Sequence, residues 1–315
     1  MVSTPGREVT VVGAGVIGLT TAVELERRGH RVQVVAEATY ERTVSSVAGA
    51  IWFPYQVGPD DRARVQRWAQ VTRAWLGELA ASTPAAGVDV LDAYELPVTE
   101  ELPWWAHGLD DVARAAAPVA GAPEAWRFRA PRAEPALLLG YLSAQLRRPV
   151  ELRRVDALAE LPGDVVVNCT GLGARALVGD DALQAVFGQV AIASPGTFPL
   201  QVTLTDERDP DSLFYVIPRR GELVLGGVAR PQPATAPLAV EPAITERVLG
   251  HAAALGLSVG DVADVRVGLR PVRPRVRLER DAADARVVHN YGHGGAGFTL
   301  GHGAACAVAD LIEEG

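Results

Sequence analysis

The first 40 residues alternate between apolar runs and a helical repeat of apolar positions. Residues 9–12 are apolar and largely β-branched, as expected for a buried parallel strand. Residues 16–28 repeat apolar side chains at helical spacing, with Leu19 and Val23 on one face, and residues 32–36 form a second apolar run. A strand, a helix and a second strand in this order predict a parallel α/β unit at the start of the chain.

The remainder of the chain predicts further parallel segments and an antiparallel region. Residues 56–140 mix proline-broken stretches with alanine-rich helical pieces, whereas the alternation within 190–228 is typical of antiparallel strands. Other expected elements are helices over 135–146, 243–255 and from about Phe298 onwards, and strands over 150–155, 165–167 and from 287. Together they predict an α/β fold with two domains. A Rossmann-like domain around a parallel sheet is expected from 1–55, 141–185 and 263–315, and a mostly antiparallel α+β domain from 56–140 and 186–262.

Composition excludes several classes of function. The chain of 315 residues carries a net charge of −8, which argues against a nucleic-acid or anionic-membrane surface. No apolar run reaches the roughly 18 residues of a membrane span. Neither a signal peptide nor a peroxisomal tail is expected, so the expected compartment is the cytoplasm. All 30 basic residues are arginines, which excludes a Schiff-base lysine. A homodimer is left open.

A glycine-rich motif lies between the first strand and the first helix. In Gly13-Ala14-Gly15-Val16-Ile17-Gly18, the first glycine suits a tight turn, the second lets the backbone approach a pyrophosphate, and the third lets helix and strand pack closely. The free N–H groups at the start of the helix favour phosphate. Glu37 and Ala38 follow the second strand, where an acid can bind ribose hydroxyls and disfavours a 2′-phosphate. The unit predicts binding of an adenine dinucleotide other than NADP.

The end of the chain favours FAD over NAD as the dinucleotide. Glycines crowd a short segment at positions 292, 294, 295, 297, 301 and 303, and such a segment lets the backbone lie against a flat ring. The helix that begins near Phe298 would direct its positive end at that ring, where it would stabilise the negative charge of a reduced flavin. An NAD-dependent dehydrogenase is the alternative when the first motif is considered by itself.

Five motifs resemble the D-amino-acid oxidase family of FAD-dependent enzymes, and the resemblance covers nearly the whole chain. They are VVGAGVIGL at 11–19, AIWFPY at 50–55, VNCTG at 167–171, GLRPVRP at 268–274 and VHNYGHGG at 288–295. The last two motifs are the most specific. The resemblance implies that the first domain binds FAD non-covalently and that the second domain binds the substrate.

The resemblance also implies roles for single residues. Arg270 matches an arginine that binds the substrate carboxylate, and Tyr215 matches a tyrosine that contacts the same carboxylate. Gly295 matches the position whose carbonyl accepts from the substrate amine, while Ile51 and Phe53 fall where the family lines the side-chain pocket. Besides the glycine motif, Glu37 and Ala38, the flavin is expected to contact Thr43, Val44, Ser45, Gly49, Ala50, Val155, Thr170, Gly171, Gly294, Gly295, Ala296, Gly297, Phe298 and Thr299.

The implied reaction is hydride transfer from the Cα of a D-amino acid to the flavin N5. The imino acid hydrolyses to a 2-oxo acid and ammonia, and O2 reoxidises the flavin to give hydrogen peroxide. The chain departs from the family at 205–212, which is shorter and lacks a tyrosine, so any lid is smaller or absent. Val228 and Ala229 stand where D-aspartate specificity would require a second arginine, and Arg230 follows one position late. Neutral D-amino acids are therefore the expected substrates.

Three other interpretations remain open, and two signals fail on their context. A glycine- or sarcosine-type oxidase, a D-aspartate oxidase and a non-catalytic flavin-binding protein would share the expected fold. The GLSVG sequence at 256–260 matches a hydrolase nucleophile elbow, but a helix precedes it and a strand follows it, which reverses that motif. His289, His293 and His302 are expected to support the glycine-rich segment, and no metal site is expected.

Overall fold

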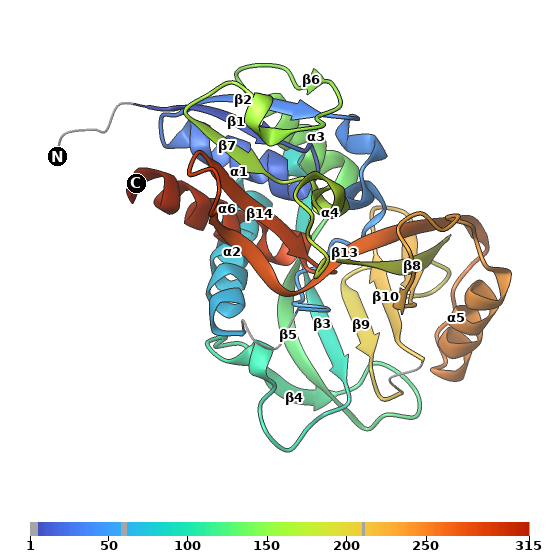
Figure 1. Ribbon diagram of the computed structural model, residues 1–315. Coiled ribbons are helices and arrows are strands. Elements are labelled where there is room, and N and C mark those ends of the chain that lie inside the picture. Colours follow the sequence, from blue (N-terminus) through green and yellow to red (C-terminus); the bar gives the residue numbers. More distant parts are fainter. Residues whose placement is uncertain (1–5, 58–61, 210–211, 315) are drawn as a thin grey trace.

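The computed structural model describes residues 6–57, 62–209 and 212–314, and its strands form one large mixed sheet (Figure 1). The strand order is β4-β5-β3-β9-β10-β11-β8-β13-β14-β7-β1-β2-β6, and β12 pairs with β8. The parallel strands lie toward one end of this order and the mostly antiparallel strands toward the other. The predicted α/β fold is confirmed.

The parallel end of the sheet positions the glycine motif. Its strands are β14 (Val287–His293), β7 (Val165–Asn168), β1 (Glu8–Val12), β2 (Arg31–Ala36) and β6 (Glu151–Leu152). They are covered by α1 (Val16–Arg27), α3 (Pro135–Gln145) and α6 (Gly297–Glu314), and α1 packs against both α3 and α6. The segments after β1, β2 and β7 meet at one edge, because parallel strands end on the same side of their sheet.

The antiparallel end supplies the opposite wall of the site. Its strands are β3 (Val88–Leu96), β4 (Ala113–Ala116), β5 (Glu124–Ala133), β8 (Gln184–Ala193), β9 (Val202–Asp206), β10 (Phe214–Pro218), β11 (Leu223–Gly226) and β12 (Arg230–Pro231). The helix α5 (Pro242–Ala254) packs on one face, where Val248 joins the core that contains Phe214 and Leu225. A further short helix is α4 (Ala174–Leu177).

One long strand joins the two ends. β13 (Val262–Arg280) pairs with β8 through Val272 and then with β14 from Val272 to Arg280. Figure 1 shows β13 crossing from the β8–β10 region to β14. Arg270 lies near the point where its partner strand changes. The parallel and antiparallel ends therefore share a continuous strand.

The region 56–140 contains more regular structure than its sequence pattern predicts. The strands β3 and β5 were missed because charged side chains interrupt their apolar alternation, and Pro131 lies within β5. Conversely, the strand expected over 150–155 is only the two residues of β6. The helix α2 (Arg62–Ser82) falls in the range expected for the substrate-binding domain and packs along α6. The domain boundaries stay a prediction.

None of the described helices is long and apolar enough to cross a membrane. The two cysteines, Cys169 and Cys306, are both free thiols.

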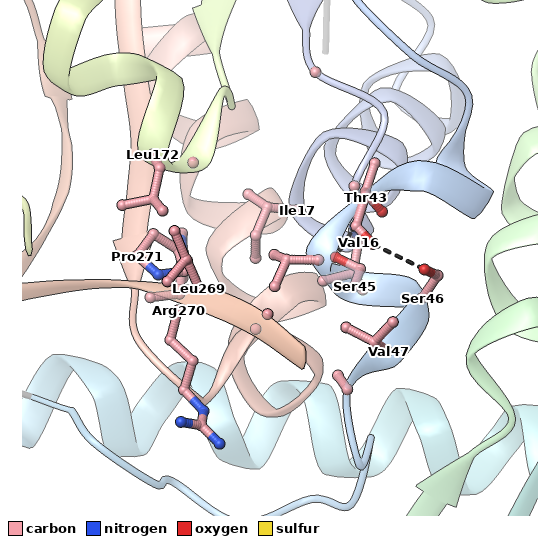
Figure 2. A pocket seen from close by; sticks show the side chains of 18 of the residues that line it. Val16, Ile17, Thr43, Ser45, Ser46, Val47, Leu172, Leu269, Arg270 and Pro271 are labelled. Atoms are coloured by element: carbon pink, nitrogen blue, oxygen red, sulfur yellow. Dashed lines mark hydrogen bonds between the residues drawn. The ribbon is translucent and has the colours of Figure 1, made fainter. Parts of the chain in front are cut away.

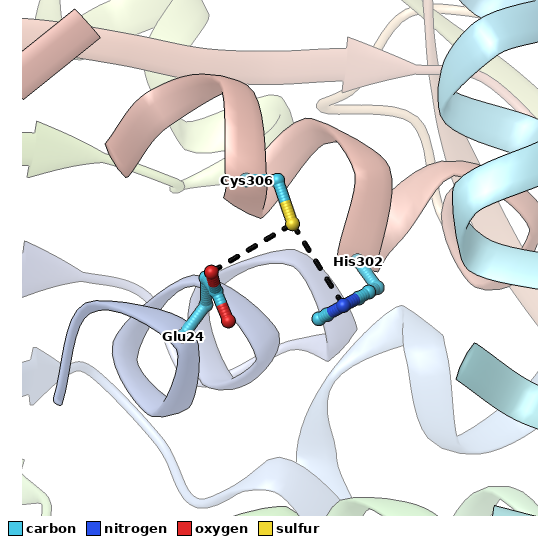
Figure 3. Close-up of side chains that lie close together, drawn as sticks. All are labelled: Glu24, His302 and Cys306. Atoms are coloured by element: carbon cyan, nitrogen blue, oxygen red, sulfur yellow. Dashed lines mark hydrogen bonds between the residues drawn. The ribbon is translucent and has the colours of Figure 1, made fainter. Parts of the chain in front are cut away.

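A buried carboxylate fastens α1 to α6. Glu24 on α1 is almost fully buried and accepts hydrogen bonds from Arg27 at 2.7 Å and Arg28 at 2.8 Å. Arg28 also binds Asp310 of α6 at 2.6 Å. Figure 3 shows Glu24 facing His302 and Cys306, the one group of three potential metal ligands within the described part of the chain. Arg27 and Arg28 already neutralise the charge of Glu24. We therefore interpret this cluster as an ionic link between α1 and α6.

Glu24→Gln should destabilise the protein in a pH-dependent way. Burial raises the pKa of Glu24, but hydrogen bonds from Arg27 and Arg28 outweigh it and lower the pKa from 4.5 to about 2. A depressed folded pKa stabilises the fold above about pH 4.5, and this contribution is lost as the pH falls toward 2. We expect a loss of about 2 kcal/mol in the free energy of unfolding at pH 7.

Urea unfolding at pH 7 and pH 3 measures this effect, with the exposed Glu101→Gln as the control. The gap between the wild type and Glu24→Gln should narrow at pH 3. A gap of equal size at both pH values would contradict the ionic role of Glu24.

Candidate active site

A large cavity opens at the carboxyl edge of the parallel strands and extends to the antiparallel end of the sheet. Its volume is about 1210 Å³, which exceeds the usual range of small-molecule sites. Gly13 and Glu37 line the part nearest to β1 and β2, and Tyr215 and Arg270 line the part nearest to β10 and β13. The cavity can therefore hold an extended cofactor together with a small substrate.

The glycine motif forms a tight turn that opens α1 toward the cavity. The Gly13 amide donates to Val35 of β2 at 2.8 Å, which fixes the turn between the two strands. Ser45 accepts a hydrogen bond from the Val16 amide at 3.0 Å and so holds the neighbouring segment against the helix start. The remaining N–H groups of the first turn lack acceptors within the helix, which makes this end of α1 a site for phosphate.

The middle of the cavity is a largely apolar space. Figure 2 shows Leu172 and Pro271 on one side and Ser45 and Val47 on the other, with Ile17 between them. Such walls suit a flat aromatic ring system. Together with the phosphate-binding turn and the acid at Glu37, they fit the parts of FAD.

The C-terminal glycine segment closes this space through close backbone contacts. A Cβ on Gly294 would lie 2.3 Å from the carbonyl oxygen of Gln56, and a Cβ on Gly295 would lie 2.6 Å from the Tyr55 ring. Both glycines line the cavity, as does Gly297, where α6 begins. The neighbouring His293 is buried, and burial lowers its pKa to about 3, so its imidazole is neutral.

Arg270 presents an unpaired edge of its guanidinium group to the cavity. Its Nη1 donates to the backbone oxygens of Val228 at 2.9 Å and Phe187 at 3.3 Å. No carboxylate among the described residues forms an ion pair with this half-buried side chain. Figure 2 shows the side chain extending away from Leu172 and Pro271. A guanidinium held on one side by carbonyls and free on the other is suited to bind a carboxylate in two-point fashion.

Two tyrosines line the cavity together with Arg270. The ring of Tyr215 rests on the backbone of Gly226 and Gly227, because a Cβ on either glycine would come within 2.6 Å of a ring carbon. The Tyr55 ring centroid is 5.6 Å from the Arg270 guanidinium carbon. Burial raises the pKa of Tyr55, so its phenol stays protonated as a donor. Tyr55 was not expected in the site, although this residue ends the AIWFPY motif.

The structure brings most of the expected site residues to this one cavity. Those that line it are Gly13, Ala14, Gly15, Val16, Ile17, Glu37, Ala38, Thr43, Val44, Ser45, Gly49, Ala50, Ile51, Phe53, Val155, Thr170, Gly171, Tyr215, Arg270, Gly294, Gly295, Gly297 and Phe298. Gly18, Ala296 and Thr299 are outside the lining. Gly18 packs on the Gly13 carbonyl, and Thr299 exchanges hydrogen bonds with the Phe53 backbone. Ala296 is fully buried in the hydrophobic core.

Comparison with known proteins assigns the family. The sequence profile described as FAD dependent oxidoreductase (DAO) matches residues 8–311. A D-amino-acid oxidase of Rubrobacter xylanophilus is 40% identical over 96% of this chain and 94% of its own length. A D-amino-acid oxidase of Streptomyces coelicolor is 40% identical over 96% of both chains. Glycine oxidase from Bacillus cereus, at 19% identity, has a TM-score of 0.79 and covers 98% of this chain and 95% of that one. The chain belongs to the D-amino-acid oxidase family of FAD-dependent oxidoreductases.

Proposed function

We propose that the protein oxidises D-amino acids with non-covalently bound FAD and O2. The observation that carries this proposal is the unpaired edge of Arg270, which faces the cavity that Tyr215 and Tyr55 also line. A guanidinium and two phenols that line one cavity suit the carboxylate of an amino acid. The relatives named D-amino-acid oxidase support the same assignment.

In this proposal FAD supplies the redox chemistry, and residues of the chain bind and orient the substrate. Bound FAD would supply the hydride acceptor for the substrate Cα and the redox chemistry that reduces O2 to hydrogen peroxide. The glycine motif, Ser45 and Glu37 would hold its dinucleotide part, and the apolar space beside Ile17 would hold its ring. The chain itself binds the substrate carboxylate at Arg270 and accepts from its amine at the Gly295 carbonyl. Catalysis then depends on orientation, because no side-chain base is needed.

A peroxide assay with both enantiomers of several amino acids tests this function. Purified protein should be yellow, should release its flavin on denaturation, and should produce peroxide from D-alanine and D-valine but not from the L-enantiomers. A clear preference for glycine or sarcosine would favour a glycine- or sarcosine-type oxidase. A preference for D-aspartate would favour a D-aspartate oxidase. Bound flavin that stays oxidised under anaerobic D-amino acid would show a non-catalytic flavoprotein.

Tyr215→Phe should weaken substrate binding without loss of flavin. The phenol is expected to donate to the substrate carboxylate, and a hydrogen bond to a charged group contributes about 1.5–3 kcal/mol. We therefore expect kcat/KM for a D-amino acid to fall about 10- to 100-fold, mostly through KM. Steady-state peroxide kinetics measure the change, and unchanged kinetics would place the phenol outside the carboxylate site.

A further inference from the structure

A carboxylate, that of Glu207, follows directly after β9, the strand whose Thr205 lines the cavity. Thr205 of β9 lines the cavity and pairs directly with Tyr215 of β10. Glu207 stands two residues further along, and its amide donates to Leu96 of β3 at 2.8 Å. The pairing of β9 with β3 therefore continues to Glu207, beyond the last residue assigned to the strand.

Strand alternation directs Glu207 toward the cavity. Side chains of residues two apart lie on the same face of a strand, so Glu207 shares the face of Thr205. The intervening Asp206 points the other way, because its carboxylate lies 3.0 Å from His251 of α5. The electrostatic surroundings of Tyr55 agree with this placement, because Glu207 raises the pKa of the Tyr55 phenol while Arg270 lowers it.

The Glu207 carboxylate is available for an external cation. Among the described residues, no hydrogen bond or ion pair engages its side chain, and the residue is exposed. The arginines nearest in the fold are otherwise occupied. Arg208 binds Asp206, Arg247 binds the Gly227 carbonyl, and Arg230 binds Glu241. Partial burial raises the pKa of Glu207, and an approaching cation would favour its ionised form.

The cavity lining includes apolar side chains that are suited to an aliphatic chain. Leu213 and Leu238 line the cavity together with Thr205. A substrate with its carboxylate at Arg270 could lay methylene groups along these residues and place a charged end near Glu207, as long cationic side chains commonly do. The absence of a second arginine after Gly227 disfavours acidic substrates but does not separate neutral from cationic ones.

We propose that Glu207 makes the enzyme select D-amino acids with a cationic side chain, such as D-arginine and D-lysine, over neutral ones of the same shape. This inference rests on the proposed oxidation of D-amino acids. Glu207 is a specificity-determining residue in it and takes no part in hydride transfer. This inference departs from the expectation of neutral substrates, because Glu207 would place cationic D-amino acids ahead of them.

Two pairs of substrates test the effect of the side-chain charge separately from that of side-chain shape. D-Citrulline matches D-arginine in shape without its charge, and D-norleucine matches D-lysine without the amine. We expect the wild type to show kcat/KM values about three- to fivefold higher for each cationic member, as an ion pair near the surface allows. Glu207→Gln should remove most of this preference by raising KM for D-arginine and D-lysine, and should leave the neutral members within about twofold. The exposed Glu100→Gln changes the net charge equally and should retain the preference.

The outcomes separate this inference from the function on which it rests. Equal kcat/KM values within each pair in the wild type, or an equal loss on all four substrates in Glu207→Gln, would overturn the role of Glu207 while D-amino-acid oxidation stands. The absence of peroxide with every D-amino acid, from protein with bound FAD, would overturn the proposed function itself and this inference with it.

Discussion

Arg270→Ala is expected to retain FAD and to lose about three orders of magnitude in kcat/KM for D-amino acids. The Arg270 guanidinium lines the cavity with an edge that can bind the substrate carboxylate at two points. Removal of one partner from a hydrogen-bonded charge pair costs about 2–5 kcal/mol, which corresponds to roughly 30- to 4000-fold. The flavin absorption spectrum measures cofactor retention, and peroxide kinetics measure turnover.

Arg230→Ala is the matched control for Arg270→Ala. Arg230 lies one position past the place where D-aspartate specificity would require a second arginine. Its side chain binds Glu241 at the surface and is not among the residues that line the cavity. Its removal should leave kcat/KM within about twofold, because an exposed ion pair contributes little. If Arg270→Ala kept the activity of the wild type, the carboxylate site would have to lie elsewhere.

Gly18→Ala is expected to abolish tight FAD binding. A Cβ at this position would lie 1.9 Å from the carbonyl oxygen of Gly13, which is backbone and cannot rotate away. Relief of this overlap must move the start of α1 away from β1, and with it the N–H groups intended for the pyrophosphate. We expect FAD affinity to fall at least about 100-fold, measured by flavin fluorescence on titration of the apoprotein.

Gly77→Ala provides the comparison for the same chemical change. Gly77 lies within α2, and a Cβ there meets no atom within 4 Å. Alanine favours a helix over glycine by about 1 kcal/mol, so this variant should keep FAD and gain slightly in thermal stability. Equal flavin affinity in Gly18→Ala and Gly77→Ala would contradict the role of the close contact at Gly18.

The sequence predicted those parts of the site whose geometry is local. The turn at 13–18, the acid at Glu37 and the glycines before α6 each act within a few residues of a strand or helix end, so spacing alone indicates their chemistry. The roles of Arg270 and Tyr215 were instead predicted from the resemblance to a family. These two residues line the same cavity because β10, β11, β8 and β13 pair in this order, and no local sequence pattern encodes that pairing.

The contributions that were missed arise from contacts between distant segments. Tyr55 lies beside Arg270 only because the loop after Ala50 folds against the C-terminal glycine segment. Glu207 looks like an ordinary surface acid until the direction of Asp206 fixes the face of β9. The strands β3 and β5 were hidden by their charged outward residues, since the alternation of a half-exposed strand is weaker than that of a buried one.

Because β13 is hydrogen-bonded to β8 and then to β14, the cofactor end and the substrate end of the cavity cannot separate as two rigid halves without breaking a shared ladder. A hinge between them would have to bend the strand that carries Arg270. Substrate must then enter, and product must leave, past side chains and loops at the rim of the cavity. Turnover should therefore depend on local movements at the rim, while the distance between Arg270 and the proposed site of the flavin ring remains constant.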